Sequence, residues 1–202
     1  MKFTGAKVKL SRSLGIALTP KAGKYMERRP YGPGEHGPPH LSRRSKMSPY
    51  KQQLIEKQRL RAQYNVHEKQ MVNYYKKAAA KTGNTGDNLV ALLESRLDAL
   101  VLRGGLANSI YAARQFVNHG HISVNGRRVN IPAFSASPGD VISVADKSKK
   151  MLPFQQVPYT TNQPDYIQFD KAAMSVTYTR VPEREDVPII CEVPLVVEYY
   201  SK

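Results

Sequence analysis

The sequence predicts an α+β protein with three parts: a basic N-terminal arm, a mainly helical domain, and a small module of helices and antiparallel strands. Two observations carry this prediction. Apolar residues recur at helical spacing from residue 49 to about residue 118, and beyond residue 121 they alternate with polar residues around an Asn-Gly pair. The predicted boundaries are 1–48 for the arm, 49–93 for the helical domain, which 180–202 completes, and 94–179 for the module.

The arm shows little periodicity beyond one possible short stretch. Residues 29–39 read RPYGPGEHGPP, which is too rich in Pro and Gly for regular structure. The basic run Arg43-Arg44-Ser45-Lys46 follows at once. Arms of this kind often become ordered only on nucleic acid.

Two helices are expected at the start of the helical domain. Ser48 and Pro49 supply an N-cap and a first-turn proline for a helix that runs to about residue 64. A second helix begins near His67 and ends at the Gly-rich residues 82–86. Its apolar face is made by Met71, Tyr74, Tyr75 and Ala78.

Two further helices lead into the module. Leucines between residues 89 and 100 predict a single helix with Asp87 as its N-cap, ended by Gly104-Gly105. Ser109 caps a fourth, short helix that stops before Gly120.

The strands follow the fourth helix. Asn125-Gly126 is a strong hairpin signal between Ile122–Val124 and the residues around Val129 and Ile131. Further strands are expected at Val141–Val144, Tyr166–Phe169 and Met174–Tyr178. Residues 193–200 fit either a terminal helix that begins at Pro194 or a strand, and the sequence leaves both open.

Charge indicates the class of partner. The formal net charge is +15, from 31 Lys+Arg against 16 Asp+Glu. Residues 1–50 and 51–150 each carry +9, whereas 151–202 carry −3. Such a balance favours a polyanion, either nucleic acid or an anionic membrane surface. No apolar run approaches the roughly 18 residues of a membrane span, so we expect a soluble protein whose basic body meets the polyanion and whose acidic end meets protein.

No cofactor, metal or small-molecule substrate is predicted. The single cysteine, Cys191, excludes an internal disulfide and a cysteine-based metal cage, and favours a reducing compartment. His36 and His40 alone would leave a tetrahedral ion unfilled. The stretch GNTGDN lacks the Lys-Ser/Thr ending of a phosphate-binding loop.

The fourth helix and the hairpin present candidate phosphate contacts. Arg114 and Gln115 lie opposite the apolar stripe and are expected to project outward, while the Asn-Gly turn exposes Arg127 and Arg128. A guanidinium on a preset turn suits bidentate contact with phosphate. From the residues alone, phosphate binding and simple solubilisation are equally open.

Ordered motifs along the whole chain resemble one family. They are PYGPGEHG, LIEKQRLRAQYNVHEKQMVNYYKKA, GNTGDNLVALLESRLDALVLRGG, ARQFVNHGHISVNGRRV and the terminal VVEYYSK. Together they resemble the small-subunit ribosomal protein number four family, of the bacterial type without N-terminal zinc cysteines, which contains the S-four RNA-binding domain.

The resemblance implies a structural protein of the small ribosomal subunit and no enzymatic activity. It implies a primary binder of small-subunit rRNA that organises a multi-helix junction during assembly. It also implies contacts with ribosomal proteins numbers three and five, a place near the channel where mRNA enters, and a contribution to decoding fidelity. The expected location is the cytoplasm, in the ribosome, with an organellar ribosome also open.

The resemblance also implies RNA-binding residues in each part of the chain. In the arm these are Lys7, Lys9, Arg12, Arg43, Arg44 and Lys46. In the helical domain they are Lys57, Arg59, Arg61, Asn73, Tyr74 and Lys76. In the module they are Arg96, Arg114, Gln115, His119, His121, Asn125, Arg127 and Arg128. For His119 and His121, capping of helix carbonyls is as good an interpretation as RNA contact.

The alternative is an RNA-modifying or RNA-handling enzyme built on the same module. Arg96-Leu97-Asp98 resembles the RLD of certain pseudouridine synthases, in which the aspartate is the nucleophile. Those enzymes need a large catalytic domain, for which this chain has no room, so we expect Asp98 to pair with a cation or stay solvated. A membrane binder ranks third, because no helix has a broad apolar face for lipid.

Overall fold

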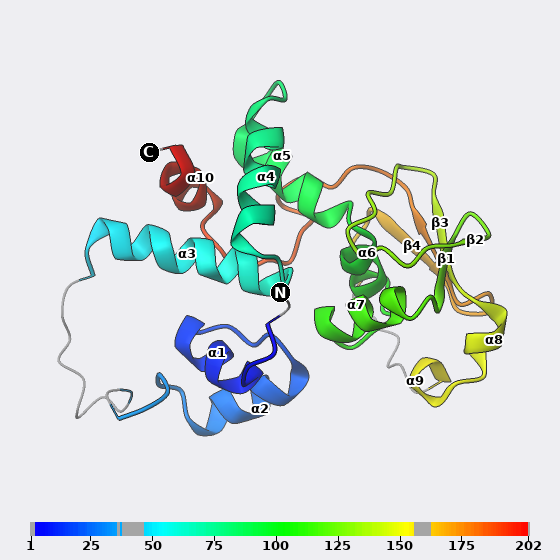
Figure 1. Cartoon of the computed structure of the whole chain (residues 1–202), viewed down its shortest axis with the longest axis horizontal. Coiled ribbons are helices and arrows are strands. Elements are labelled where there is room, and N and C mark those ends of the chain that lie inside the picture. The colour runs from blue at the N-terminus through cyan, green and yellow to red at the C-terminus, as the bar shows by residue number, and fades with distance from the viewer. Residues whose placement is uncertain (1–2, 36, 38–46, 156–162, 202) are drawn as a thin grey trace. The chain divides into compact units, whose positions relative to one another are not determined.

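The computed structural model describes residues 3–35, 37, 47–155 and 163–201 (Figure 1). The chain divides into two compact units. The first unit comprises Met1–Ala80 and Ile189–Lys202, and the second comprises Lys81–Pro188. The packing boundary therefore lies between residues 80 and 81, ahead of the boundary expected between residues 93 and 94.

The first unit is helical. Its elements are α1 (Lys7–Leu14), α2 (Pro20–Arg28), α3 (Pro49–Gln63), α4 (Glu68–Ala79) and α10 (Val193–Ser201). The predictions for α3 and α4 are confirmed, since Ser48 Oγ accepts from the amide of Lys51 at the start of α3 and Met71 and Ala78 of α4 are fully buried. The helices α1 and α2 were not predicted, since the arm was expected to have little periodicity.

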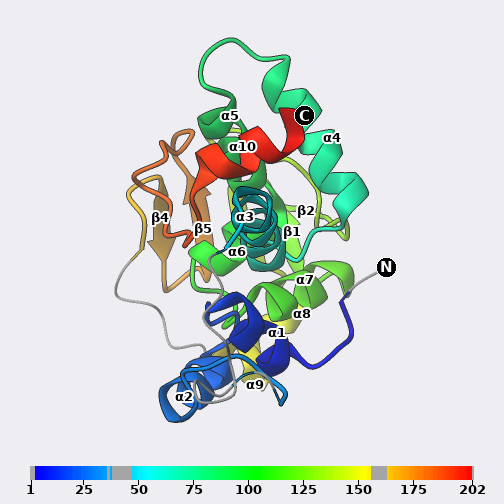
Figure 2. The same cartoon turned by 90° about the vertical axis from the view of Figure 1, so that its left-hand side faces the viewer.

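The last helix settles the open question at the C-terminus. Residues 193–201 form α10 rather than a strand, and Figure 2 shows α10 beside α3. Val193 and Val196 enter the same core as Leu60 and Tyr64 of the α3 region. Ahead of α10, the Gln63 side-chain amide exchanges two hydrogen bonds with the backbone of Ile190 (3.1 and 3.2 Å).

The second unit combines short helices with one antiparallel sheet. Its helices are α5 (Thr85–Glu94), α6 (Leu97–Arg103), α7 (Ile110–Asn118), α8 (Asp146–Lys149) and α9 (Leu152–Gln155). Its strands are β1 (Ile122–Val124), β2 (Arg127–Arg128), β3 (Val141–Val144), β4 (Ile167–Asp170) and β5 (Ser175–Tyr178). The strand order is β2-β1-β3-β5-β4, with every pairing antiparallel. The predicted α+β class is confirmed.

The sheet has one apolar and one polar face, as its register requires. Ile142 is paired with both Val124 and Val176, so these three side chains share the buried face. On the other face the hydroxyls of Ser123 and Ser143 lie 2.9 Å apart. The helix α6 contacts β5, in the region where Figure 1 draws α6 and α7 beside the strands.

The single leucine-rich helix expected from residue 87 is wrong in two respects. Asn84 rather than Asp87 is the N-cap of the first helix, because its Oδ1 accepts from the amide of Gly86 at 2.8 Å. The helix also breaks after Glu94, since Arg96 is extended and forms a β-bridge with Ser135.

Two further parts of the module differ from the sequence-based expectations. The residues around Val129 and Ile131 do not extend the hairpin strand, which stops at Arg128. No helix was predicted for the basic stretch after β3, which contains α8. Both differences concern elements of two to four residues, whose ends are hard to predict from the pattern of neighbouring residues.

Core truncation tests the packing of the second unit. Leu100→Ala removes a side chain with 0% exposure and should lower the free energy of unfolding by about 2–5 kcal/mol. Leu152→Ala is the matched control, because that side chain is 65% exposed and its loss should cost less than about 0.5 kcal/mol. Urea denaturation measures both, and equal effects would contradict this packing.

Candidate nucleic-acid interface

The hairpin turn after α7 positions two arginines at the surface. Asn125 and Gly126 both have positive φ (49° and 76°), as a two-residue turn of the Asn-Gly type requires. Arg127 is paired with Val124 and Arg128 with Ser123, and both arginine side chains are exposed. Because neighbouring strand residues point to opposite faces, the two guanidiniums leave the hairpin on different sides.

Arg128 is bound back to the end of α7. Its Nη2 donates to the carbonyl oxygen of His119 at 3.1 Å. That carbonyl lies at the C-terminal end of the helix, where the helix dipole favours a cation. Within the described residues, the side chain of Arg127 makes no hydrogen bond or ion pair, and only its backbone pairs with Val124. His119 and Gln115 are exposed beside this end of the helix.

His121 and Asn125 serve the fold with their side chains. Nδ1 of His121 lies 2.9 Å from Oγ of Ser148, and its ring meets Phe154 edge-on. Burial, together with the neighbouring His119 and Arg128, lowers the pKa of His121. Asn125 connects two turns, because its Nδ2 donates to Asp140 Oδ1 (2.8 Å) and its Oδ1 accepts from the amide of Val141 (2.9 Å).

Arg96 and Asp98 form a buried ion pair at the break between α5 and α6. Two nitrogens of Arg96 donate to the two carboxylate oxygens of Asp98 at 2.9 and 2.6 Å, and both side chains are almost fully buried. Burial raises the pKa of Asp98, and the facing guanidiniums oppose that shift. The expectation that Asp98 pairs with a cation is confirmed, and Arg96 is buried away from solvent.

The outward orientation predicted for Arg114 is wrong. Its Nη1 lies 3.7 Å from Oδ2 of Asp98, and its side chain is only 12% exposed. The pattern of α7 alone did not reveal this, because the carboxylate that attracts Arg114 belongs to α6. The exposed basic side chains of this region are therefore those of the hairpin.

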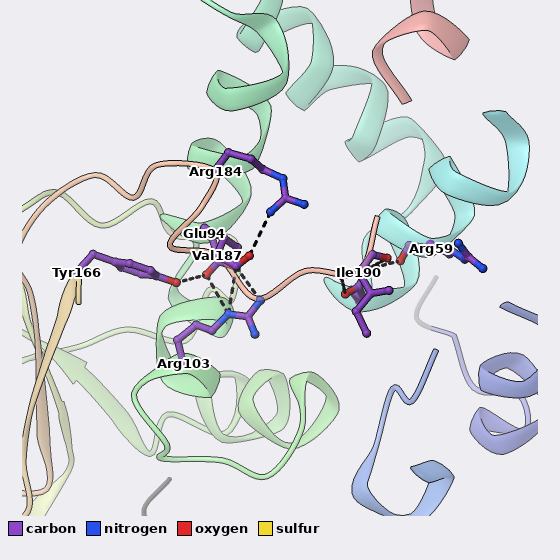
Figure 3. Close-up of polar contacts among 8 residues, drawn as sticks. Arg59, Glu94, Arg103, Tyr166, Arg184, Val187 and Ile190 are labelled. Carbon is purple, nitrogen blue, oxygen red and sulfur yellow. Dashed lines mark hydrogen bonds and ion pairs between the residues drawn. The ribbon is translucent and has the colours of Figure 1, made fainter. Parts of the chain in front are cut away.

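A second buried cluster was not predicted. The carboxylate of Glu94 is fully buried and accepts from Arg103 (2.8 Å) and from the hydroxyl of Tyr166 (3.0 Å), as Figure 3 shows. Burial and this carboxylate raise the pKa of Tyr166, and burial raises that of Tyr178 to about 12. Both tyrosines are therefore neutral over the ordinary pH range, and the hydroxyl of Tyr166 is the one that donates to Glu94.

In the first unit, the basic residues predicted on α3 hold helices together. Lys57 Nζ lies 3.0 Å from Oε2 of Glu68 and 4.6 Å from the ring centre of Tyr199, with only 5% of its side chain exposed. Arg61 approaches the same carboxylate at 3.5 Å, and the hydroxyl of Tyr200 donates to it at 2.8 Å. These three partners of Glu68 join α3, α4 and α10.

Arg59 and Arg12 also have internal partners. Arg59 bonds Glu56 (2.6 Å) and donates from Nε to the carbonyl of Leu14 (2.8 Å). Arg12 donates to the backbone carbonyls of Tyr31 and Gly32 (3.1 and 3.0 Å). Both arginines are half-buried rather than fully exposed.

The remaining predicted residues of the first unit lie at its surface or outside the described chain. Lys7, Lys9, Asn73 and Lys76 are exposed, and Tyr74 is half-buried. Four further exposed basic residues, which were not predicted, lie on or just after α2, namely Lys21, Lys24, Arg28 and Arg29. Arg43, Arg44 and Lys46, like His36 and His40, lie outside the described residues.

The signal for α2 is present in the sequence. Thr19 caps it by accepting from the amide of Ala22 (3.2 Å), and Pro20 occupies the first turn. This is the arrangement that predicted α3 from Ser48 and Pro49. Applied at Thr19-Pro20, it would have predicted a helix and placed its lysines on it.

Comparison with known proteins identifies the family. The model of the ribosomal protein S4/S9 N-terminal domain matches residues 2–94, and that of the S4 domain matches residues 95–142. A protein of Micrococcus luteus named small ribosomal subunit protein uS4 is 52% identical over 201 residues, covering 96% of this chain and 95% of the relative. The chain belongs to the uS4 family. The resemblance stated from the motifs is confirmed.

Other relatives carry the same name. The uS4 protein of Streptomyces griseus is 51% identical, covering 97% of each chain, and that of Chlorobium limicola is 50% identical, covering all of this chain and 99% of the relative. These ribosomal names do not support the enzyme alternative.

Two kinds of site, a cluster of metal ligands and a membrane-spanning helix, are absent from the described residues. Within them, no three His, Cys, Asp or Glu side chains gather as a metal site. None of the helices in the described part has both the length and the apolar character needed to cross a bilayer.

Breaking the buried ion pair should be costly. Arg96→Met leaves the Asp98 carboxylate without its closest counter-charge and should lower the free energy of unfolding by about 3–5 kcal/mol. Replacing both partners, as Arg96→Met with Asp98→Leu, should cost less, because the fully buried carboxylate is removed together with its guanidinium, and the cation that then loses a partner is Arg114, whose side chain is 12% exposed. Chemical denaturation measures both. A single variant as stable as the double variant would contradict the role of the pair.

The lowered pKa of His121 predicts a pH dependence of stability. The folded protein binds the imidazole proton less readily than the unfolded chain does. The contribution of His121 is therefore present above about pH 6.5, the ordinary value, and is lost as the pH falls below it. His121→Gln should reduce the fall in unfolding free energy between pH 7 and pH 5. An unchanged pH profile in thermal or urea unfolding would contradict this assignment.

Proposed function

We propose that this chain is a structural, non-enzymatic component of the small ribosomal subunit that binds rRNA. The observation that carries the proposal is the exposed basic end of the S4 domain, where Arg127, Arg128 and His119 surround the hairpin. The names of the relatives support the same assignment. The ribosome of the cytoplasm, or of an organelle, is the location that this function implies.

The binding we propose is electrostatic in origin and selective for shape. Each phosphate that a guanidinium neutralises releases condensed counterions, so affinity falls as salt rises. A folded RNA junction gathers phosphates from several helices, and fixed cations can match that arrangement. Arg128 is held by the carbonyl of His119, so one guanidinium of the hairpin is ordered before RNA arrives.

A second contact region is proposed on the first unit. This region consists of exposed residues on three helices. They are Lys7 and Lys9 of α1, Asn73 and Lys76 of α4, and the basic residues of α2. Lys57, Arg59, Arg61, Arg12, Arg96 and Arg114 have internal partners, and we assign them to support of the surface rather than to direct contact.

The finer role follows the family. We propose that binding organises a multi-helix rRNA junction during assembly, and that the protein meets ribosomal proteins three and five near the channel where mRNA enters, with an effect on decoding fidelity. The acidic segment that contains Glu183 and Asp186 is the part assigned to protein contact. Arg43, Arg44 and Lys46 are assigned to the mRNA side by the resemblance alone.

Substitution of the hairpin arginines tests the proposal. Arg127→Ala with Arg128→Ala should weaken binding of the full chain to small-subunit rRNA and reduce the salt slope by roughly 0.7–0.9 for each lost contact. Arg180→Ala is the matched control, because Arg180 is an exposed arginine of the same unit paired with Asp186. Filter binding across a salt series measures affinity and slope.

Two outcomes would overturn the proposal. If the double variant binds with the affinity and slope of the unaltered chain, the hairpin is not the RNA-binding surface. If the purified chain converts an RNA nucleoside with turnover, the enzyme alternative returns. Co-sedimentation with small subunits at one copy each is the result expected of a structural component.

A further inference from the structure

We propose that Gly120 is a positioning residue for the Arg128 guanidinium in RNA binding. The inference rests on the proposed function and concerns how one of its contacts is prepared. It goes beyond the usual role of a glycine that ends a helix, because the space above this glycine is occupied by a functional side chain.

Gly120 ends α7 in the left-handed conformation, with φ of 69°. Its amide donates to the carbonyl of Val117 (2.8 Å), and the next amide, of His121, donates to Phe116 (3.0 Å). These bonds leave the His119 carbonyl outside the helix, where it accepts from Arg128. Helix termination therefore creates the acceptor that holds the arginine.

The guanidinium lies directly against the glycine backbone. A Cβ placed on Gly120 would collide with Nε, Nη2 and Cζ of Arg128. Any other residue at this position would therefore displace the guanidinium from the His119 carbonyl. The absence of a side chain at Gly120 is what lets Arg128 take up its observed position.

Position matters because a free arginine must be ordered when it binds. Ordering a flexible side chain reduces affinity, and a side chain that is already fixed avoids that reduction. Arg128 uses one of its five N–H groups on His119, which leaves others for a phosphate oxygen. Releasing Arg128 from Gly120 should thus weaken binding while the charge is retained.

Gly120→Ala is the direct test, measured with the full chain and small-subunit rRNA. We expect affinity to fall by roughly 2- to 10-fold, with a salt slope equal to that of the unaltered chain because no charge is lost. Gly139→Ala is the matched control, since Gly139 also has positive φ (95°) but nothing lies within 4 Å of a Cβ there. The Gly139→Ala variant therefore introduces backbone strain without displacing a side chain, and it should leave the affinity for rRNA unchanged.

A double-variant cycle separates positioning from strain. In an Arg128→Ala background the effect of Gly120→Ala on affinity should disappear, whereas in an Arg127→Ala background it should persist in full. Arg128→Lys provides a variant without backbone strain. It keeps the charge but loses the planar fork, so it should lower affinity with an unchanged slope, even if Gly120→Ala folds poorly.

The outcomes distinguish this inference from the proposed function. If Arg128→Ala weakens rRNA binding but Gly120→Ala and Gly139→Ala have the same affinity for rRNA, the hairpin contact stands and positioning by Gly120 is wrong. Positioning is also wrong if the effect of Gly120→Ala survives in the Arg128→Ala background. If neither arginine substitution affects binding, the proposed function itself fails at this surface.

Discussion

A buried carboxylate at the start of α6 is the constraint on which the second unit depends. Asp98 is removed from water, and a desolvated charge is stable only beside a counter-charge. Arg96 supplies that charge from the extended residue between α5 and α6, and Arg114 of α7 approaches the same oxygen. The ion pair thereby couples the helix break to the placement of α7. Since α7 leads into the hairpin, a cluster withdrawn from solvent helps to position the side chains that we assign to RNA.

The first unit uses charge in the same way, which changes the meaning of the net charge of +15. Glu68 forms ion pairs with Lys57 and Arg61, and Glu56 forms one with Arg59. The basic residues predicted on α3 therefore mainly stabilise the packing of the first unit. A bulk excess of positive charge identifies the class of partner, but it does not say which cations reach that partner. Burial and pairing decide which cations remain exposed, and exposed cations remain on α1, α2, α4 and the hairpin.

Local signals predicted those elements whose cause is local. The Ser48-Pro49 cap and the Asn125-Gly126 turn each depend on neighbouring residues, and both structures follow. The break in the leucine-rich helix has a distant cause, because the amides after Arg96 bond to carbonyls of residues 132 and 134. Arg114 was misplaced for the same reason, since periodicity describes the face of one helix and not the carboxylate on the next. At α2, by contrast, the signal was present at Thr19-Pro20 and was not used.

The two hairpin arginines show why adjacency in sequence does not imply equivalence. Arg127 and Arg128 have the same chemistry and are both exposed. Of the two, Arg128 donates a hydrogen bond to the end of α7, and its guanidinium packs against the backbone of Gly120. A fixed cation gives a definite location for a phosphate, and an arginine without such a bond can adapt to the phosphates that lie nearby. One hairpin can therefore combine a reference point with an adjustable contact. That combination suits a junction whose helices are brought together as the protein binds, because the fixed contact sets the register in which the others form.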